Sequence, residues 1–505
     1  MPRPVIALLL LAALLHAPGA GVRAEDQEGC TIGVAAGFVT ADGRPLVWKT
    51  RDADAVDNEV RFVTDAPLPF VGVFTVGGVS PWMSVNVRGF ALVNATSVDL
   101  PGRGTWGNGS FMRYAIGHCA TVSEFEHLLD STNATGRGTQ AHFAVIDALG
   151  AAAIFETGDS VYWKFDATDR ESTPGGYVLR ANFAMNGRGV WGANRYRRSA
   201  AIIEGLRAEN RLGYPELIQG HLRDFAAADG TPYPVPYSDR PAPHLPVGLI
   251  PTAWSIARDA SVSAAVIQGV LPGEQPITTT MWTLLGQPAC AVAVPVWAAG
   301  LPPRELRGEP TAALCDAARK HKAVVFRFER DPLTGRMAEH ADSYLLRDGG
   351  GHGIWGGTFT AERLMFSEVE RLMTRWRWAL PDTSELLALE ERMAVMGLAA
   401  LRGVPGPPGD PDRVEPSRPA LAQNYPNPFN AGTTIVFDIP VGTRGRVSLR
   451  LYDVLGREVV TLVDEEKDPG SYAVRWDAGG RAGGTYFCRL QMETFVETRR
   501  LILMK

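Results

Sequence analysis

The sequence predicts a large α+β domain followed by a small all-β domain. Strand pairs alternate with helices over residues 30–403, a Pro/Gly-rich segment follows at 404–420, and residues 421–505 alternate apolar and polar positions between short turns. With 505 residues and 45% hydrophobic composition, the chain can bury a large core. A formal net charge of −5, without long basic runs, argues against nucleic acid as a partner.

The beginning of the chain has the features of an export signal. Residues 5–15 form an apolar run behind a basic residue, and Val22-Arg23-Ala24 fits a small-residue cleavage site, with Ala20 as the competing site. The run is shorter than the ~20 residues that span a bilayer. We therefore expect residues 1–24 to be a signal peptide, residues 25–29 to be a short propeptide, and the mature protein to be soluble.

Hairpins open the large domain. The stretch "TIGVAAGFVTADGRPLVWKTRDAD" predicts two strands joined by a turn at 41–43, which places Cys30 at the open end of the hairpin. The next predicted elements are a second hairpin with its turn at 86–89, a helix at 111–129 and two or three strands in 141–167. Thr121 or Ser123 is a candidate N-cap for the second part of that helix.

Helices become more frequent toward the end of this domain. We expect a strand from Tyr177, a helix in 193–210, strands in 261–271 and 278–297, and helices in 309–320 and 360–402. Asp382 and Gly403 carry the start and stop signals of the last helix. The glycine-rich stretch 349–357 predicts a loop, and residues 404–420 predict a semi-rigid linker.

The segment after the linker predicts a β-sandwich of about seven strands. It resembles the C-terminal sorting domain of the type IX secretion system and the related immunoglobulin-like domain of flagellar hook-capping proteins, through "NYPNPFN" at 424–430, "LYDVLGREV" at 451–459, Trp476, "GGTYFCRL" at 483–490 and Lys505. The resemblance implies that secretion machinery recognises residues 421–505. It also implies a secreted or cell-surface protein that passes through the periplasm of a bacterium with an outer membrane. A generic surface module without a sorting role is the alternative.

The cysteines direct attention to the start of the mature chain. There are five, which is an odd number for an exported protein. Cys30 lies too far behind the apolar run to suit a lipid anchor. It is either a disulfide partner, for example of Cys119, or a nucleophile released by cleavage of the Gly29–Cys30 bond. The sequence does not predict how Cys290, Cys315 and Cys488 pair.

An N-terminal cysteine would carry its own base. The thiolate is the nucleophilic form of cysteine, and an α-amine with a pKa of about 7.7 to 8.0 can accept the thiol proton near neutral pH. Cleavage after Gly29 would create this amine and expose the thiol in one step. Glycine suits that position because it has no Cβ to block attack by the adjacent sulfur.

The residues around Cys30 resemble the start of the N-terminal-nucleophile (Ntn) cysteine hydrolases. "GCT", followed by "TADGRPLVWKTRD", is similar to the group that holds bile salt hydrolase, penicillin V acylase and the isopenicillin N acyltransferases. The resemblance implies a four-layer αββα sandwich in which Cys30 is the nucleophile and Asp52 lies beside it. Lys49 falls where bile salt hydrolase has arginine, so Lys49 and Arg51 are both candidates for the substrate-binding role.

Three further residues match motifs of this group in chain order. "SVNVRGFALVNATS" resembles the segment whose asparagine donates to the oxyanion, which implies Asn94. "YVLRANF" implies Asn182 as the residue that orients the nucleophile, and "NRYRRSA" implies Arg195. Loss of one oxyanion donor typically costs about 3 to 4 kcal/mol. Taken singly, each residue also fits a strand-end cap, a surface turn or the solvated face of a helix.

The resemblance implies a hydrolase that cleaves a linear, non-peptide amide bond of a small molecule through an acyl-enzyme on Cys30, with acyl transfer as a further possibility. A dipeptidase of the related N-terminal-cysteine family is an alternative, since "CT…DG…KTRD" also resembles its opening. A non-catalytic surface module with a disulfide-bonded Cys30 is another. The nine histidines show no metal-binding spacing, so the sequence implies neither a metal nor a cofactor. The sequence does not show which acyl group and which amine the substrate contains, and it does not show the oligomeric state.

Overall fold

The computed structural model of the chain describes residues 29–102, 107–239, 245, 247–330, 337–347, 351, 353–376, 379, 382–403, 419–421, 424, 429, 432–440, 445–467, 470–492 and 495–504. The predicted signal peptide and most of the predicted linker lie outside the described residues. Within these residues, no helix combines the length and the apolar character that crossing a membrane requires.

A six-stranded sheet holds the hairpin that begins at Cys30. Its strand order is β10 (Tyr177–Arg180), β1 (Cys30–Ala35), β2 (Leu46–Asp52), β12 (Ser261–Gln268), β13 (Thr280–Leu285) and β14 (Val294–Val296), with antiparallel neighbours throughout. Every residue of β1, β2, β12 and β13 is buried, so both faces of the sheet are covered. The predicted turn at 41–43 is present, and Gly43 adopts the left-handed conformation there, with φ +79°.

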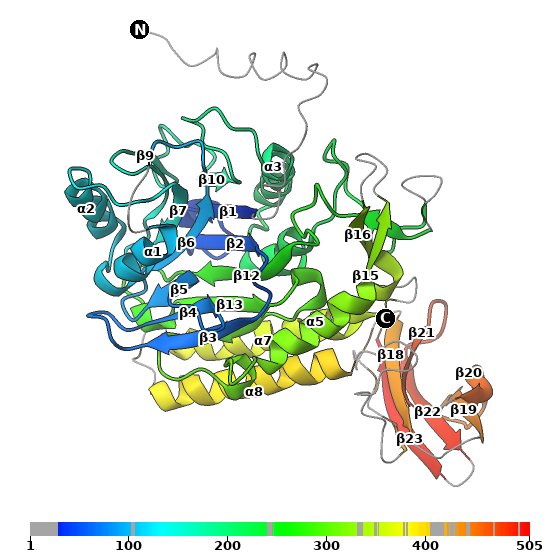
Figure 1. Ribbon diagram of the computed structural model, residues 1–505. Helices are drawn as coiled ribbons and strands as arrows, with labels where there is room; N and C mark the ends of the chain where they lie inside the picture. The colour runs from blue at the N-terminus through cyan, green and yellow to red at the C-terminus, as the bar shows by residue number, and fades with distance from the viewer. Residues whose placement is uncertain are drawn as a thin grey trace.

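A seven-stranded sheet packs against the first sheet. It is an antiparallel meander in chain order, formed by β3 (Asn58–Val63), β4 (Phe70–Thr75), β5 (Pro81–Asn86), β6 (Ala91–Thr96), β7 (Ala141–Ile146), β8 (Ala152–Thr157) and β9 (Tyr162–Asp166). Strands β1 and β2 lie against β6 and β7 (Figure 1). Alternation along β4 divides its side chains: Val71 and Val73 join the core shared with the first sheet, whereas Phe70 and Phe74 point to the opposite face.

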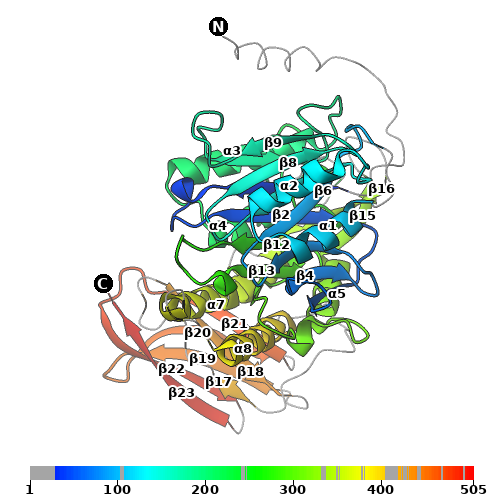
Figure 2. The ribbon, with the colours of Figure 1, turned by 90° about the vertical axis from the view of Figure 1, so that its left-hand side faces the viewer.

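Helices cover the outer faces of both sheets (Figures 1 and 2). On the seven-stranded sheet lie α1 (Gly107–His118) and α2 (Val122–Thr132), which enclose an apolar core with Phe70 and Phe74. The helices packed near the six-stranded sheet include α4 (Tyr214–Gln219), α5 (Ala313–Val325), α7 (Ile354–Trp376) and α8 (Thr383–Arg402). Helix α3 (Ala193–Ala208) lies beside β10 and β1. A small sheet of β11 (Leu249–Pro251), β16 (Met337–Asp342) and β15 (Phe326–Arg330) and the short α6 (Ser343–Leu346) complete this part.

The C-terminal part is all β. One sheet contains β17 (Ala420–Leu421), β18 (Gly432–Ile439) and β21 (Gly470–Asp477), and the other contains β20 (Glu458–Lys467), β19 (Gly445–Tyr452), β22 (Gly484–Met492) and β23 (Phe495–Leu503). Trp476 is buried in its core, 5.5 Å from the ring of Phe429 and 5.1 Å from that of Tyr486.

The predicted mixed α/β domain and the all-β segment after it are both present. Two details of the sequence prediction were wrong. The helix expected at 111–129 is two helices, although Thr121, one of the two N-caps predicted for its second part, does cap the second helix by accepting from the Glu124 backbone N–H. The loop expected at 349–357 ends earlier, since α7 already begins at Ile354. The four-layer αββα assignment and the immunoglobulin-like assignment stay predictions.

Candidate active site

Cys30 is the first residue of β1 and is held as part of the β1–β2 ladder. It lies opposite Arg51, and the ladder extends one residue further because the Asp52 N–H donates to the Gly29 carbonyl at 2.7 Å. Side chains 30, 32, 49 and 51 fall on one face of the sheet by strand alternation. Lys49 contacts β6, so this face looks toward the seven-stranded sheet. Cys30 is 9% exposed.

The backbone of Cys30 is clamped by two of the predicted residues. Its N–H donates to Asn182 Oδ1 at 2.9 Å, and its carbonyl accepts from Arg195 Nη1 at 2.6 Å. Arg195 Nη2 also donates to Asn182 Oδ1 at 2.8 Å, while Asn182 Nδ2 donates to the Thr96 carbonyl at 2.9 Å. These bonds fix the amide of Asn182 with its oxygen toward the Cys30 nitrogen.

Asp52 lies against Gly29, the residue before Cys30. Its Oδ1 accepts from Ser261 Oγ at 2.6 Å, and its Oδ2 lies 3.6 Å from Arg258 Nη1. A Cβ added to Gly29 would lie 2.8 Å from Asp52 Oδ2, 2.9 Å from Arg258 Nη1 and 3.0 Å from Arg195 Nη2. Glycine is therefore the residue that fits at position 29 without displacing a charged group.

The charged groups beside Cys30 shift one another's pKa values. Burial raises the pKa of Asp52, and the positive charges of Arg258 and Arg195 oppose that rise. Burial lowers the pKa of Arg195 to about 10, with Asp52 acting in the opposite direction. At neutral pH, Arg195 therefore stays a cation beside Asp52.

Asn94 approaches from the facing sheet. It lies on β6, is 3% exposed, and accepts at Oδ1 from Lys49 Nζ at 2.7 Å. Lys49 Nζ also donates to the Trp82 carbonyl at 3.3 Å. Because an ammonium group can only donate, this contact assigns the oxygen of the Asn94 amide to Lys49 and turns its NH2 group away from Lys49.

Arg51 contacts three strands of the seven-stranded sheet. It donates from Nη1 to Asn58 Oδ1 at 2.7 Å and from Nη2 to Thr75 Oγ1 at 3.3 Å. Its guanidinium carbon lies 4.7 Å from the centre of the Trp82 ring, within the range of a cation–π interaction. Lys49 Nζ lies 5.8 Å from the centre of the same ring, so half-buried Trp82 of β5 contacts both predicted substrate-binding cations.

The structure thus gathers the predicted residues into two adjoining groups. One group lies around the Gly29–Cys30 peptide and consists of Cys30, Asp52, Asn182 and Arg195. The other group consists of Lys49 and Arg51, on the face of β2 that they share with Cys30, and of Asn94 on the facing strand β6. Sequence reasoning missed Arg258 and Ser261, which contact Asp52. Ser261 is the first residue of β12 and Arg258 precedes it, in "ARDASVSAAV", where nothing local marks them as different from surface residues.

The cysteines are not cross-linked. All five are free thiols, so the predicted alternative of a bridge between Cys30 and Cys119 is not present. Burial raises the pKa of Cys119 and of Cys488 to about 12, and that of Cys315 to about 11. These three thiols stay protonated and unreactive at neutral pH.

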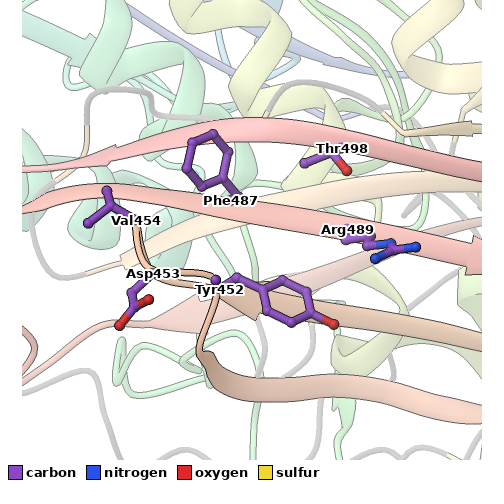
Figure 3. A pocket seen from close by; sticks show the side chains of 7 residues that line it. Tyr452, Asp453, Val454, Phe487, Arg489 and Thr498 are labelled. Atoms are coloured by element: carbon purple, nitrogen blue, oxygen red, sulfur yellow. The ribbon is translucent and has the colours of Figure 1, made fainter.

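Two surface hollows of the described residues lie away from Cys30. One, of about 310 Å³, is on the C-terminal part between the turn after β19 and the outer faces of β22 and β23, where Tyr452, Phe487 and Arg489 line it (Figure 3). The other, of about 230 Å³, lies beside α1 near Arg113 and His118. Neither contains a residue of the Cys30 cluster.

Comparisons with known proteins assign the C-terminal part. Residues 423–504 match a family model described as "Secretion system C-terminal sorting domain". The match indicates a secreted or cell-surface protein of a bacterium with an outer membrane. A search of curated proteins finds no match.

The chain is also similar, at low identity, to solved structures of amide hydrolases. Penicillin V acylase from Agrobacterium tumefaciens has 13% identity and a TM-score of 0.32, with 53% of this chain and 85% of that chain covered. A mutant of conjugated bile acid hydrolase from Clostridium perfringens has 10% identity and a TM-score of 0.32, with coverages of 50% and 89%. The N-acylethanolamine-hydrolyzing acid amidase ortholog of Caenorhabditis elegans has 12% identity and a TM-score of 0.29, with coverages of 47% and 92%.

Proposed function

We propose that this protein is a secreted Ntn-type cysteine hydrolase that cleaves a linear, non-peptide amide bond through an acyl-enzyme on Cys30. The observation that carries the proposal is the placement of the Cys30 nitrogen, which lies 2.9 Å from Asn182 Oδ1 at the open end of the β1–β2 hairpin. The Asp52 carboxylate lies against Gly29, the residue before Cys30. An α-ammonium at this position would have a fixed acceptor in Asn182, with Asp52 as its candidate counter-ion.

Activation is cleavage of the Gly29–Cys30 bond. The Cys30 sulfur adds to the Gly29 carbonyl carbon, the C–N bond breaks, and the thiol proton passes to the leaving nitrogen. The Asp52 N–H, 2.7 Å from the Gly29 oxygen, would stabilise negative charge on that oxygen during the addition. Water then hydrolyses the thioester, which releases the propeptide with a carboxylate at Gly29 and leaves a free amine and a free thiol on Cys30. Trimming by another protease is the alternative route to the same N-terminus.

Turnover uses the two groups of the terminal residue. The α-amine takes the thiol proton, the sulfur attacks the carbonyl carbon of the amide substrate, and the NH2 group of Asn94 with a backbone amide holds the oxyanion. The α-ammonium returns the proton to the leaving amine as the C–N bond breaks. Water then hydrolyses the acyl-enzyme, and an acceptor amine in its place would give acyl transfer.

The surrounding residues keep this geometry. Asp52 would pair with the α-ammonium, and Arg195 would hold both the Cys30 carbonyl and the Asn182 amide. Lys49 and Arg51 would act on the substrate side, because they share a sheet face with Cys30. The two facing sheets with helices on their outer sides are the packing expected of the αββα sandwich.

The test is intact mass and N-terminal sequencing of the purified protein, with Cys30→Ser and Cys30→Ala as variants. We expect wild type to begin at Cys30 and to hydrolyse acylated amines, and Cys30→Ala to keep residues before Cys30 and to be inactive. Wild-type activity on N-terminally free dipeptides, with none on acylated amines, would indicate a dipeptidase. Full activity of Cys30→Ala would refute the proposal.

A further inference from the structure

The turn that carries Asn182 is held by buried groups that the proposed reaction does not use. This turn, residues 181–189, follows β10 and contains the asparagine whose oxygen accepts from the Cys30 nitrogen. Asn182 makes its own bonds to Thr96 and Arg195. The position of the residues that follow Asn182 in the turn depends on the side chains that bind their backbone N–H groups.

Glu156 binds that backbone from the neighbouring sheet. Its side chain lies on β8 and is completely buried, at 0% exposure. One carboxylate oxygen accepts from the Met185 N–H at 2.6 Å, and the other accepts from the Asn186 N–H at 3.1 Å and from Asn186 Nδ2 at 2.9 Å. Arg180 Nε, at the end of β10, donates to the first oxygen at 2.7 Å. A single carboxylate thus binds the residues on both sides of Asn182.

The charges around Glu156 keep it ionised. Burial acts to raise its pKa, but Arg180 and the donors of the turn outweigh that effect, so the pKa of Glu156 is below its ordinary value. His142 also faces this cluster, and burial lowers its pKa to about 4, so it is neutral at neutral pH. Neutral His142 can donate from Nε2 to the Phe183 carbonyl, 3.0 Å away. Glu156 is therefore the anion that balances Arg180 and accepts from the turn.

Asp99 holds the same turn from its other side. Its Oδ2 accepts from the Ala184 N–H at 3.0 Å and from the Gly189 N–H at 2.9 Å. A Cβ on Gly187 would lie 2.1 Å from the same oxygen, so the turn passes closely over the carboxylate. The two carboxylates together bind four backbone N–H groups of the turn, counting Ala184, Met185, Asn186 and Gly189.

We propose that Glu156 is a positioning residue of this active site, with Asp99 as its second support. It fixes the turn so that Asn182 Oδ1 stays on the nitrogen of Cys30 and orients the α-amine for proton transfer. This inference rests on the proposed function, since it assigns a role in the use of that amine. Glu156 does not touch the reacting atoms and acts through Asn182.

The test is Glu156→Gln in the full-length protein, measured after N-terminal sequencing has confirmed the mature start. The glutamine keeps the volume but replaces one acceptor oxygen with a donor that faces the N–H groups of the turn. We expect kcat to fall between about 10- and 100-fold at little change in KM, because misplacement of a positioning group acts on the chemical step. The acid limb of the pH–kcat/KM profile should move to lower pH, because the α-ammonium loses a hydrogen-bond acceptor that favours its charged form.

The matched control is Glu274→Gln. Glu274 is also a buried carboxylate paired with an arginine, Arg44, and it accepts from the Leu271 N–H at 2.8 Å. It follows β12 beyond Gln268, the end of that strand that pairs with Leu46. Gln268 is seven residues, or roughly 23 Å of strand, from Ser261, which pairs with Asp52. We expect Glu274→Gln to lose stability like Glu156→Gln while its kcat and its pH profile stay at wild-type values.

The outcomes separate the inference from the proposed function. If Cys30→Ala is inactive but Glu156→Gln keeps the wild-type kcat and pH profile, the positioning role is wrong and the hydrolase proposal stands. If Cys30→Ala is fully active, the hydrolase proposal itself fails. Should Glu156→Gln not fold, Asp99→Asn releases the same turn from its other side, and an unchanged kcat and pH profile in that variant would overturn the inference.

Discussion

Gly29→Ala separates activation of the protein from its catalysis. The new methyl group would lie 2.8 Å from Asp52 Oδ2 and 2.9 Å from Arg258 Nη1, whereas ordinary contacts of a carbon atom are about 3.5 to 4.0 Å. These atoms belong to flexible side chains, but Asp52 is buried and bonded to Ser261 at 2.6 Å, and the Arg258 side chain is only 12% exposed. Relief therefore requires displacement of about 0.6 Å or more.

Overpacking of this kind costs about 1 to 3 kcal/mol. If this free energy is added to the barrier for attack of the Cys30 sulfur on the Gly29 carbonyl, the rate of cleavage before Cys30 should fall between about 5- and 150-fold. The assay is intact mass of the purified precursor over time. The mature protein no longer contains residue 29, so the fraction of Gly29→Ala that does mature should have the wild-type kcat and KM.

The control substitution is Gly205→Ala, which introduces a methyl group on α3 where no atom lies within 4 Å. It should mature at the wild-type rate. Maturation of Gly29→Ala at the wild-type rate would refute the steric reasoning. A mature Gly29→Ala protein with altered kcat would refute the assignment of residue 29 to the propeptide.

Three other predictions concern the oxyanion, a buried acid and the thiols. Asn94→Ala should lower kcat by about 10²- to 10³-fold with little change in KM, measured by steady-state kinetics, if its NH2 group holds the oxyanion. Burial raises the pKa of Glu390 well above its ordinary value. The stability that neutral Glu390 provides is therefore complete below about pH 4.3 and is lost as the pH rises toward the folded-state pKa. In wild type, this loss lowers the free energy of unfolding as the pH rises from about 5 to 8. Glu390→Gln should reduce that decline, as measured by urea titrations at each pH. Alkylation of the native mature protein at neutral pH should modify Cys30, as detected by peptide mapping. The thiols of Cys119, Cys315 and Cys488 should stay unmodified, because burial raises their pKa values. A Cys30 that resists alkylation until the protein unfolds would contradict its role as the nucleophile.

Local patterns predicted the elements that carry the nucleophile. Alternating apolar residues and the turn at 41–43 were enough to place Cys30 at the open end of a hairpin, and the structure has β1 and β2 there. Start signals worked where a side chain caps its own helix, as at Asp382, which accepts from the Ser384 N–H. Such interactions span a few residues, so the sequence displays both partners together.

Contacts between distant segments were harder to predict. Arg258 and Ser261 reach Asp52 only because β12 pairs with β2, more than 200 residues away in the chain. The contact of Lys49 with Asn94 depends on two sheets packing face to face. The start of α7 was missed because glycines at 349–357 weaken the helical pattern, although Ile354 and Trp355 are buried there against a separate apolar core.

The central claim is that activity requires the free amine of Cys30. It is tested most directly by following one sample of precursor as it matures, with activity and the fraction of chains that begin at Cys30 measured at each time. We predict that activity is proportional to this fraction and extrapolates to zero when no chain begins at Cys30. Full activity in a sample whose chains all begin upstream of Cys30 would contradict the claim.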